Sequence, residues 1–297
     1  FTHPNIWTKI GDYLSLNENF NLYIFGAFMI FLYLCINLFL LQKNQSIVLL
    51  FAMISYPAFF AIERGQNDLL MFSMVFIGLN LNRKFRFIAL WLATILKIYP
   101  IFVFSRYVQK NLVILLPLSI GLLTLFMNIN EILIISDISP KTYWSSFGVG
   151  SMNIFFKEYI FDNNSLLYAL VISSTAVCYI YLNKNFDKFY TINLNYKNDS
   201  IFFAGLSIYV GLFFFTSSYD YKLIFLIICI PYLISKKNKY STYILLLILL
   251  SSNVDLFLYH FGIVGVIIDL ILKFLLFICF STIFLNYLRK VFIKIKK

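Results

Sequence analysis

The polar segment Glu63–Asp68 interrupts an apolar part of the chain, and Lys97 and Tyr99 lie inside a later apolar run. A charged side chain at the centre of a lipid bilayer costs about 2.5–3.5 kcal/mol on insertion scales. Ionisable residues at such positions are therefore functional candidates by default. We predict that this stretch is a binding site and that Glu63 and Tyr99 belong to it.

The residue types suggest which ligand such a site would bind. Arg64 and Lys97 suit a phosphate or pyrophosphate, the first as a bidentate fork and the second as a point charge. Sugar hydroxyls need mixed donors and acceptors, and these are supplied by Gln66, Asn67 and Asp68. We expect Gly65 to permit a close backbone approach, since it has no Cβ. An ordinary helix start with locally paired charges remains the alternative.

A second polar turn, Ser217–Lys222, precedes another apolar run and contains Asp220 and Lys222. We expect both charges to face the same cavity as the first site, although an interfacial ion pair flanked by tyrosines explains them equally well. His260 is a candidate proton carrier because histidine titrates near neutral pH. A loop histidine with no evident partner is the simpler interpretation.

Composition indicates the class of protein. Hydrophobic residues make up 61% of the chain, charged residues 12%, and the mean hydropathy is +0.84. A soluble globular domain carries about 25% charged residues, so that class is excluded. We predict one integral membrane domain over residues 1–297, in contact with membrane lipids. The net charge of +11 is attributed to the cytoplasmic side of the membrane and not to nucleic-acid binding.

The apolar runs predict an all-α, polytopic transmembrane protein, because an open strand would leave backbone groups unpaired in lipid. The candidate spans are Asn21–Leu41, Ser46–Ile62, Leu69–Leu81, Phe87–Arg106, Leu112–Asn130, Leu166–Leu182, Ile201–Thr216, Leu223–Ile234, Thr242–Leu258 and Ile263–Asn286. The four cysteines lie far apart inside these runs and are expected to be ordinary core residues: Cys35, Cys178, Cys229 and Cys279.

The basic residues follow the positive-inside rule only if the run 87–106 enters the membrane and returns on the same side. Pro100 favours a break there, because it removes a backbone donor and restricts the preceding residue. We therefore predict about nine crossings plus a re-entrant helical hairpin near Lys97–Pro100. A kinked span whose Lys97 reaches toward the interface is the alternative.

This topology places the polar turns on one external face. Residues 1–20 form an external segment, 131–165 an external loop with an interfacial helix, and 287–297 a basic cytoplasmic tail. The aromatic residues of the 131–165 loop also fit an interfacial belt. The missing initiator methionine and the absence of a signal-peptide pattern suggest an N-terminally truncated chain.

Sequence signatures of soluble enzymes are absent. There is no P-loop, dinucleotide fingerprint, zinc-binding HExxH or nucleophile elbow. The two histidines, His3 and His260, have no partner at metal-ligand spacing. We therefore predict neither a metal nor a cofactor.

The order of these features resembles glycosyltransferase family 87. The resemblance rests on Arg64-Gly65-Gln66-Asn67-Asp68, a short span with a basic turn, the Leu96-Lys97 and Pro100 apex, and the turn Ser218–Lys222. His3-Pro4-Asn5 resembles the segment that ends the family's first external loop. The match covers most of the chain, but its motifs are short.

The resemblance implies a GT-C fold and inverting transfer of a mannose-like sugar at the external face. The donor would be a polyprenyl-phosphate-linked sugar and the acceptor a lipid or glycan. In this class an aspartate of the first external loop is the general base, and cationic groups such as Arg64 or Lys97 would stabilise the departing phosphate. The expected base would precede Phe1, so the catalytic residue is unassigned and this chain could be inactive. A bacterial inner membrane with a periplasmic active face fits best.

Two other function classes remain open. A transporter or flippase of a lipid-linked or anionic solute would use the same intramembrane charge and re-entrant element. A polymerase or ligase of surface polysaccharide would share the external loop and the lipid-linked donor.

Overall fold

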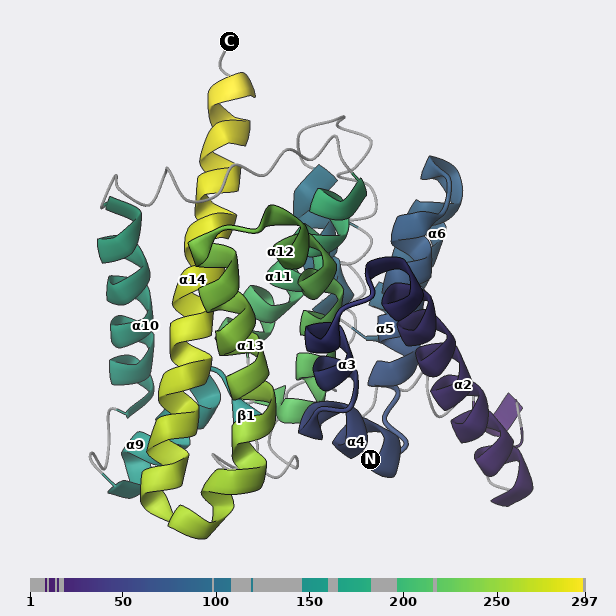
Figure 1. Ribbon diagram of the computed structural model, residues 1–297, viewed down its shortest axis with the longest axis horizontal. Coiled ribbons are helices and arrows are strands. Elements are labelled where there is room, and N and C mark those ends of the chain that lie inside the picture. The colour runs from purple at the N-terminus through teal and green to yellow at the C-terminus, as the bar shows by residue number, and fades with distance from the viewer. Residues whose placement is uncertain are drawn as a thin grey trace. The chain divides into compact units, whose positions relative to one another are not determined.

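The computed structural model describes residues 9, 11–13, 15, 19–97, 99–107, 119, 146–159, 165–182, 197–215 and 218–295. This part of the chain is almost entirely helical (Figure 1), which confirms the all-α prediction. The short strands β1 (Ser146–Phe147) and β2 (Ser218–Tyr219) pair antiparallel. The chain divides into two compact units. Unit 1 comprises Phe1–Asn44 and Ala61–Pro140, and unit 2 comprises Gln45–Phe60 and Lys141–Lys297.

Unit 1 is built around helix α5. Its elements are α2 (Asn19–Asn44), the end of α4 (Tyr56–Glu63), α5 (Asp68–Asn80), α6 (Arg83–Leu96) and the 3₁₀ helix η1 (Tyr99–Tyr107). Helix α5 packs against both α2 and α6. The ring of Tyr33 on α2 meets the ring of Phe72 on α5 edge-on, with centroids 5.3 Å apart. Gly78 lets α6 approach, since a Cβ there would lie 3.1 Å from the Cβ of Ala89.

The chain reverses direction after α6. Helix α6 ends at Leu96, and Lys97 is extended, with φ −149° and ψ 138°. The ring of Phe104 on η1 then stacks on Phe87 at the start of α6, with centroids 6.4 Å apart and an interplanar angle of 9°. A continuous helix would separate these two residues by about 25 Å. The predicted break is therefore present, and η1 folds back along α6 as a hairpin. Re-entry of this hairpin into a membrane stays a prediction.

Unit 2 surrounds helix α11. Its elements are α3 (Ile47–Met53), the start of α4, α9 (Val149–Tyr159), α10 (Ser165–Leu182), α11 (Lys197–Phe215), the 3₁₀ helix η4 (Asp220–Cys229), α12 (Ile230–Lys236), α13 (Lys239–Leu258), η5 (Tyr259–Phe261) and α14 (Ile263–Ile295). Helices α13 and α14 form an antiparallel pair joined through η5, and α10 packs on α14 (Figure 1). Residues 199–213 of α11 are all buried, as expected of a helix that is apolar on every side.

Gly205 sets the close contact between α11 and η4. A Cβ at this position would lie 2.6 Å from the Sγ of Cys229 and 2.8 Å from the carbonyl oxygen of Phe225. Real Cβ atoms do not approach other atoms so closely, so the contact requires glycine. This packing holds η4 against α11. Asp220 is the first residue of η4 and is positioned by the same contact.

Helix α9 lies within the segment 131–165, where we predicted an interfacial helix. Its buried side contains Val149, Met152 and Phe155, whereas Lys157 and Glu158 are exposed. The helix is thus present with one apolar side, and that side packs against α10 and α11.

Two described helices are long and apolar enough to cross a membrane: Asn21–Asn44 in α2 and Ile263–Arg289 in α14. The other described apolar helices are shorter. Large apolar side chains along α2 are exposed, among them Tyr23 at 74% and Phe31 at 62%. Many exposed large apolar side chains on one helix are unusual on soluble monomers, which agrees with a membrane protein.

The other predicted spans differ from the helices in detail. The span Ser46–Ile62 is divided into α3 and α4, and Leu223–Ile234 is divided between η4 and α12. The span Leu112–Asn130 and most of the external segment 1–20 lie outside the described residues. The number of crossings stays a prediction.

Candidate functional site

A tight C-terminal cap on α4 positions the first predicted polar segment. The amide of Gly65 donates to the carbonyl of Ile62 at 3.0 Å, and the amide of Gln66 donates to Ala61 at 2.9 Å. These bonds and the φ of +54° at Gly65 define a Schellman motif. No atom of the chain lies within 4 Å of a Cβ built at Gly65, so the close backbone approach expected there stays a prediction about a ligand. Glycine is favoured here by the left-handed backbone conformation.

The turn leads directly to Asp68, the first residue of α5, whose side chain is fully buried. Its carboxylate accepts hydrogen bonds from the Nζ of Lys97 and, at 2.5 Å, from the hydroxyl of Tyr99. The N-terminal end of a helix also favours a negative charge. We call these three residues the Asp68 cluster. Asn67 precedes the helix without a side-chain capping bond, so the segment is not simply a capped helix start.

The hairpin after α6 explains how Lys97 and Tyr99 reach this carboxylate. Because α6 ends at Leu96, neither residue is held by a regular α-helical turn, and both side chains meet Asp68 across the hairpin apex. The Lys97 side chain is 13% exposed, whereas Asp68 is sealed. The ammonium of Lys97 is thus held by a buried carboxylate and keeps limited access to a ligand.

The other residues predicted for this site lie on the turn before α5. Glu63 and Arg64 are exposed, and Gln66 and Asn67 are half-buried. The ion-pair partner of Lys97 is Asp68, which follows these residues on the same segment. The structure therefore brings Asp68, Lys97 and Tyr99 together and leaves the remaining polar groups on the adjoining turn.

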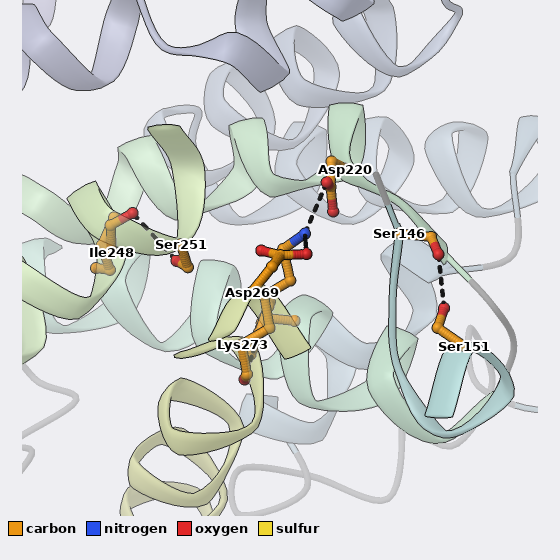
Figure 2. A network of polar contacts seen from close by, with 8 residues as sticks. Ser146, Ser151, Asp220, Ile248, Ser251, Asp269 and Lys273 are labelled. Atoms are coloured by element: carbon orange, nitrogen blue, oxygen red, sulfur yellow. Dashed lines mark hydrogen bonds and ion pairs between the residues drawn. The ribbon is translucent and has the colours of Figure 1, made fainter. Parts of the chain in front are cut away.

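A second buried cluster lies in unit 2. Asp220 begins η4, and its Oδ2 is 2.7 Å from the Nζ of Lys273 on α14. The same ammonium is 2.6 Å from the Oδ2 of Asp269, one helical turn earlier (Figure 2). We call these three residues the Asp220 cluster. Their side chains are 0%, 1% and 4% exposed for Asp220, Lys273 and Asp269.

Helix α11 closes the Asp220 cluster from another side. The hydroxyl of Tyr209 donates to the backbone carbonyl of Lys273 at 2.8 Å. The ring of Tyr209 stacks on Phe147 with centroids 5.2 Å apart, next to the β1–β2 pairing that precedes Asp220. Polar contacts therefore join α11, η4 and α14 within an otherwise apolar core.

The second set of predicted residues is only partly brought together. Asp220 belongs to a charged cluster, but the cation that it binds is Lys273, whereas Lys222 is half-buried on η4. His260 lies exposed in η5. The partner of Asp220 on α14 was not predicted, and the expectation that Asp220 and Lys222 face one cavity stays a prediction.

Sequence reasoning missed Asp269 and Lys273. Both lie inside the apolar run 263–286 at a spacing of four residues, which places them on one face of a helix. The argument that singled out Lys97 as a costly intramembrane charge applies to both, so the signal was present. Their link to Asp220 spans more than fifty positions of sequence, and no local pattern shows it.

Among the described residues, no three His, Cys, Asp or Glu side chains group closely enough to hold a metal ion. The chain matches no protein-family model, no curated protein and no solved structure.

Proposed function

We propose that this protein is a membrane glycosyltransferase that uses a lipid-phosphate-linked sugar donor. The observation that carries this proposal is the Asp68 cluster. A partly accessible Lys97 ammonium is fixed by a sealed carboxylate at the apex of a helical hairpin. A fixed cation in a low-dielectric site stabilises the charge that develops on a departing phosphate.

Each residue of the cluster has a different proposed role. Asp68 and Tyr99 fix Lys97 in position, and Lys97 binds the donor phosphate together with the exposed guanidinium of Arg64. Gln66 and Asn67, on the half-buried part of the same turn, bind sugar hydroxyls. Asp68 is not the general base, because both of its oxygens already accept hydrogen bonds. The base that accepts the proton of the acceptor hydroxyl is not assigned.

The proposal includes a membrane arrangement. The chain crosses the membrane several times, about nine on the charge pattern. The α6–η1 hairpin enters from the external face and returns, with Lys97 at its tip. Non-helical backbone at that depth is tolerated where it is buried in protein or lines a wet cavity. The membrane is proposed to be a bacterial inner membrane.

The test is reconstitution of the full chain in liposomes with a radiolabelled polyprenyl-phosphate mannose and a lipid acceptor fraction. The expected result is consumption of the donor with release of the lipid phosphate. Lys97→Ala should abolish donor use, whereas Lys43→Ala, which alters an exposed lysine at the end of α2, should leave it unchanged. Equal donor use by Lys97→Ala and the wild type would contradict the proposed role.

A transporter or flippase is the second candidate, favoured by the Asp220 cluster, because its members Asp269 and Lys273 lie inside the long apolar helix α14. Ionisable groups at such depth are typical of ion and substrate pathways. In the same liposomes, a transporter would move the labelled donor across the bilayer unchanged. Selective consumption of a donor that carries an oligosaccharide would instead indicate a polymerase or ligase.

A further inference from the structure

The turn between α12 and α13 carries three lysines within four positions. Lys236 is the last residue of α12, Lys237 follows as its C-terminal cap, and Lys239 is the first residue of α13. All three side chains are exposed. In the part of the chain that the structure describes, no carboxylate pairs with any of them. The turn therefore presents concentrated positive charge to its surroundings.

Local contacts hold this turn in one conformation. The Nζ of Lys236 lies 4.8 Å from the ring centroid of Tyr232, which is buried. Lys237 has a left-handed backbone, with φ 45° and ψ 33°. The amide of Asn238 donates to the Oγ of Ser241 at 3.1 Å, and the amide of Ser241 donates to the Oδ1 of Asn238 at 2.7 Å, which caps α13. The lysines are thus kept close together despite their mutual repulsion.

The exposed face of α13 changes in character along the helix. After the lysine at its start come two tyrosines and then two leucines, all 38–56% exposed: Tyr240, Tyr243, Leu246 and Leu250. Their spacing of three or four residues places them on one face of the helix. Cation, aromatic ring and aliphatic chain, in this order, match the headgroup, interfacial and hydrocarbon layers of a bilayer.

Helix α14 brings further basic residues to the same end of unit 2. Because α13 and α14 are antiparallel, the C-terminal end of α14 lies at the same end of the pair as the start of α13 (Figure 1). Arg289 is exposed near that end, and five of the nine residues 289–297 are Lys or Arg. The two helices therefore gather basic residues at one end of an apolar surface.

The arrangement favours a lipid over other anions. Protein surfaces that bind nucleic acid are polar as well as positively charged. The α13 face instead continues from the lysine turn into exposed leucines. A lysine at the end of an apolar face lays its methylene groups along that face and extends its ammonium to the headgroup layer. Anionic lipids supply negative charge at that depth.

We propose that the α12–α13 turn binds the headgroup of an anionic phospholipid. The ammonium groups of Lys236, Lys237 and Lys239 contact the headgroup phosphate, and an acyl chain lies along Tyr243 and Leu246 of α13. The site is independent of the proposed transferase activity, since it involves no residue of the Asp68 cluster. It fixes the depth of α13 in a membrane that contains such lipids.

The test is native mass spectrometry of the purified full chain, titrated in detergent with phosphatidylglycerol or with phosphatidylcholine. The wild type should bind phosphatidylglycerol more tightly, and raised salt should weaken this preference. The triple variant Lys236→Gln, Lys237→Gln and Lys239→Gln should lose about a hundredfold in affinity for phosphatidylglycerol, because each lysine near an anionic surface contributes about fivefold. Each single variant should lose about fivefold, which keeps the test informative if the triple variant fails to fold.

A matched triple variant removes the same charge from separate parts of the chain. Lys9→Gln, Lys43→Gln and Lys157→Gln alter three exposed lysines and should leave the preference for phosphatidylglycerol unchanged. Wild-type affinity in the variants of the turn, or an equal loss in the matched variant, would overturn the proposal. A soluble oligonucleotide that displaces the lipid from the wild type would do the same, because the turn would then be a nucleic-acid site.

Discussion

The two buried clusters use the same chemical groups in different proportions. In unit 1, Asp68 meets one lysine, Lys97, and the hydroxyl of Tyr99. In unit 2, Lys273 meets two aspartates. The Lys97 side chain is 13% exposed and that of Lys273 is 1% exposed. The unit 1 cluster is thus partly open, whereas the unit 2 cluster is closed.

The difference in exposure between Lys97 and Lys273 affects what each lysine can bind. A partly exposed lysine can bind an anionic ligand while it remains close to its carboxylate partner. A lysine buried between elements cannot reach a ligand without local opening, and it instead fixes η4 to α14. We therefore expect the same substitution to change the stability of the protein by different amounts in the two clusters.

The largest effect is expected for Lys273→Met. Removing one member of a buried ion pair typically costs about 3–5 kcal/mol, because the remaining charge has no compensation. Lys97→Met should cost less, since its position is partly open and Tyr99 still donates to Asp68. Thermal unfolding in detergent measures both, with the exposed Lys239→Ala as control. Equal losses of thermal stability for the substitutions at positions 273 and 97 would contradict the distinction between a closed and a partly open cluster.

Gly205→Ala should have the next largest effect. The added Cβ would collide with the Sγ of Cys229 and the carbonyl of Phe225, and overpacking of this kind costs about 3 kcal/mol at the upper end of its usual range. Because α11 then moves from η4, the Asp220 cluster should loosen while the Asp68 cluster does not. Hydrogen exchange of η4 and η1 measures this. Faster exchange in η1 alone would be evidence against the separate support of the two clusters.

Tyr99→Phe should affect the Asp68 cluster by a smaller amount. It deletes one hydrogen bond to a buried carboxylate, worth about 2 kcal/mol, and keeps the ring in place. Lys97 remains paired, so the substitution should weaken donor binding more than it weakens folding. A donor-binding titration and a thermal unfolding curve separate the two quantities. Tyr23→Phe, at an exposed position on α2, is the matched control and should change neither.

The smallest effect is expected for Gly65→Ala. The backbone at this position has a φ of +54°, and a side chain in the left-handed region costs about 1 kcal/mol. The space around it is open, so no collision adds to that cost. Gly26→Ala, in the interior of α2, should instead be slightly stabilising, because alanine favours a helix. A loss well above this size at position 65 would indicate a close contact there after all.

Local chemistry accounts for the parts of the fold that were predicted. The break after Leu96 follows from Pro100, which restricts its predecessor and cannot donate a helical hydrogen bond. The helix in the segment 131–165 and the all-α class follow from apolar periodicity and length. Asp68, Lys97 and Tyr99 could be named because charges in apolar runs are costly, and the hairpin brings them into contact.

Other features depend on positions far apart in the sequence. The pairing of Asp220 with Lys273 joins η4 to α14, and sequence proximity alone offered only Lys222 as an ion-pair partner for Asp220. The exposed His260 carries no local pattern that would separate a proton carrier from an ordinary surface histidine. In both cases the decisive information is which elements pack together.

The amino-acid sequence alone was enough to predict the apolar helical class of this protein, the helix break before Pro100, and some of the residues whose burial is costly. These properties arise from hydrophobic transfer, backbone stereochemistry and charge, which act over a few neighbouring residues. Only the tertiary structure decided which charge faces which, that one lysine is sealed between two aspartates, and that another keeps access at a hairpin apex. Those outcomes depend on the packing of distant elements, because the energy of a buried charge is set by all the groups around it.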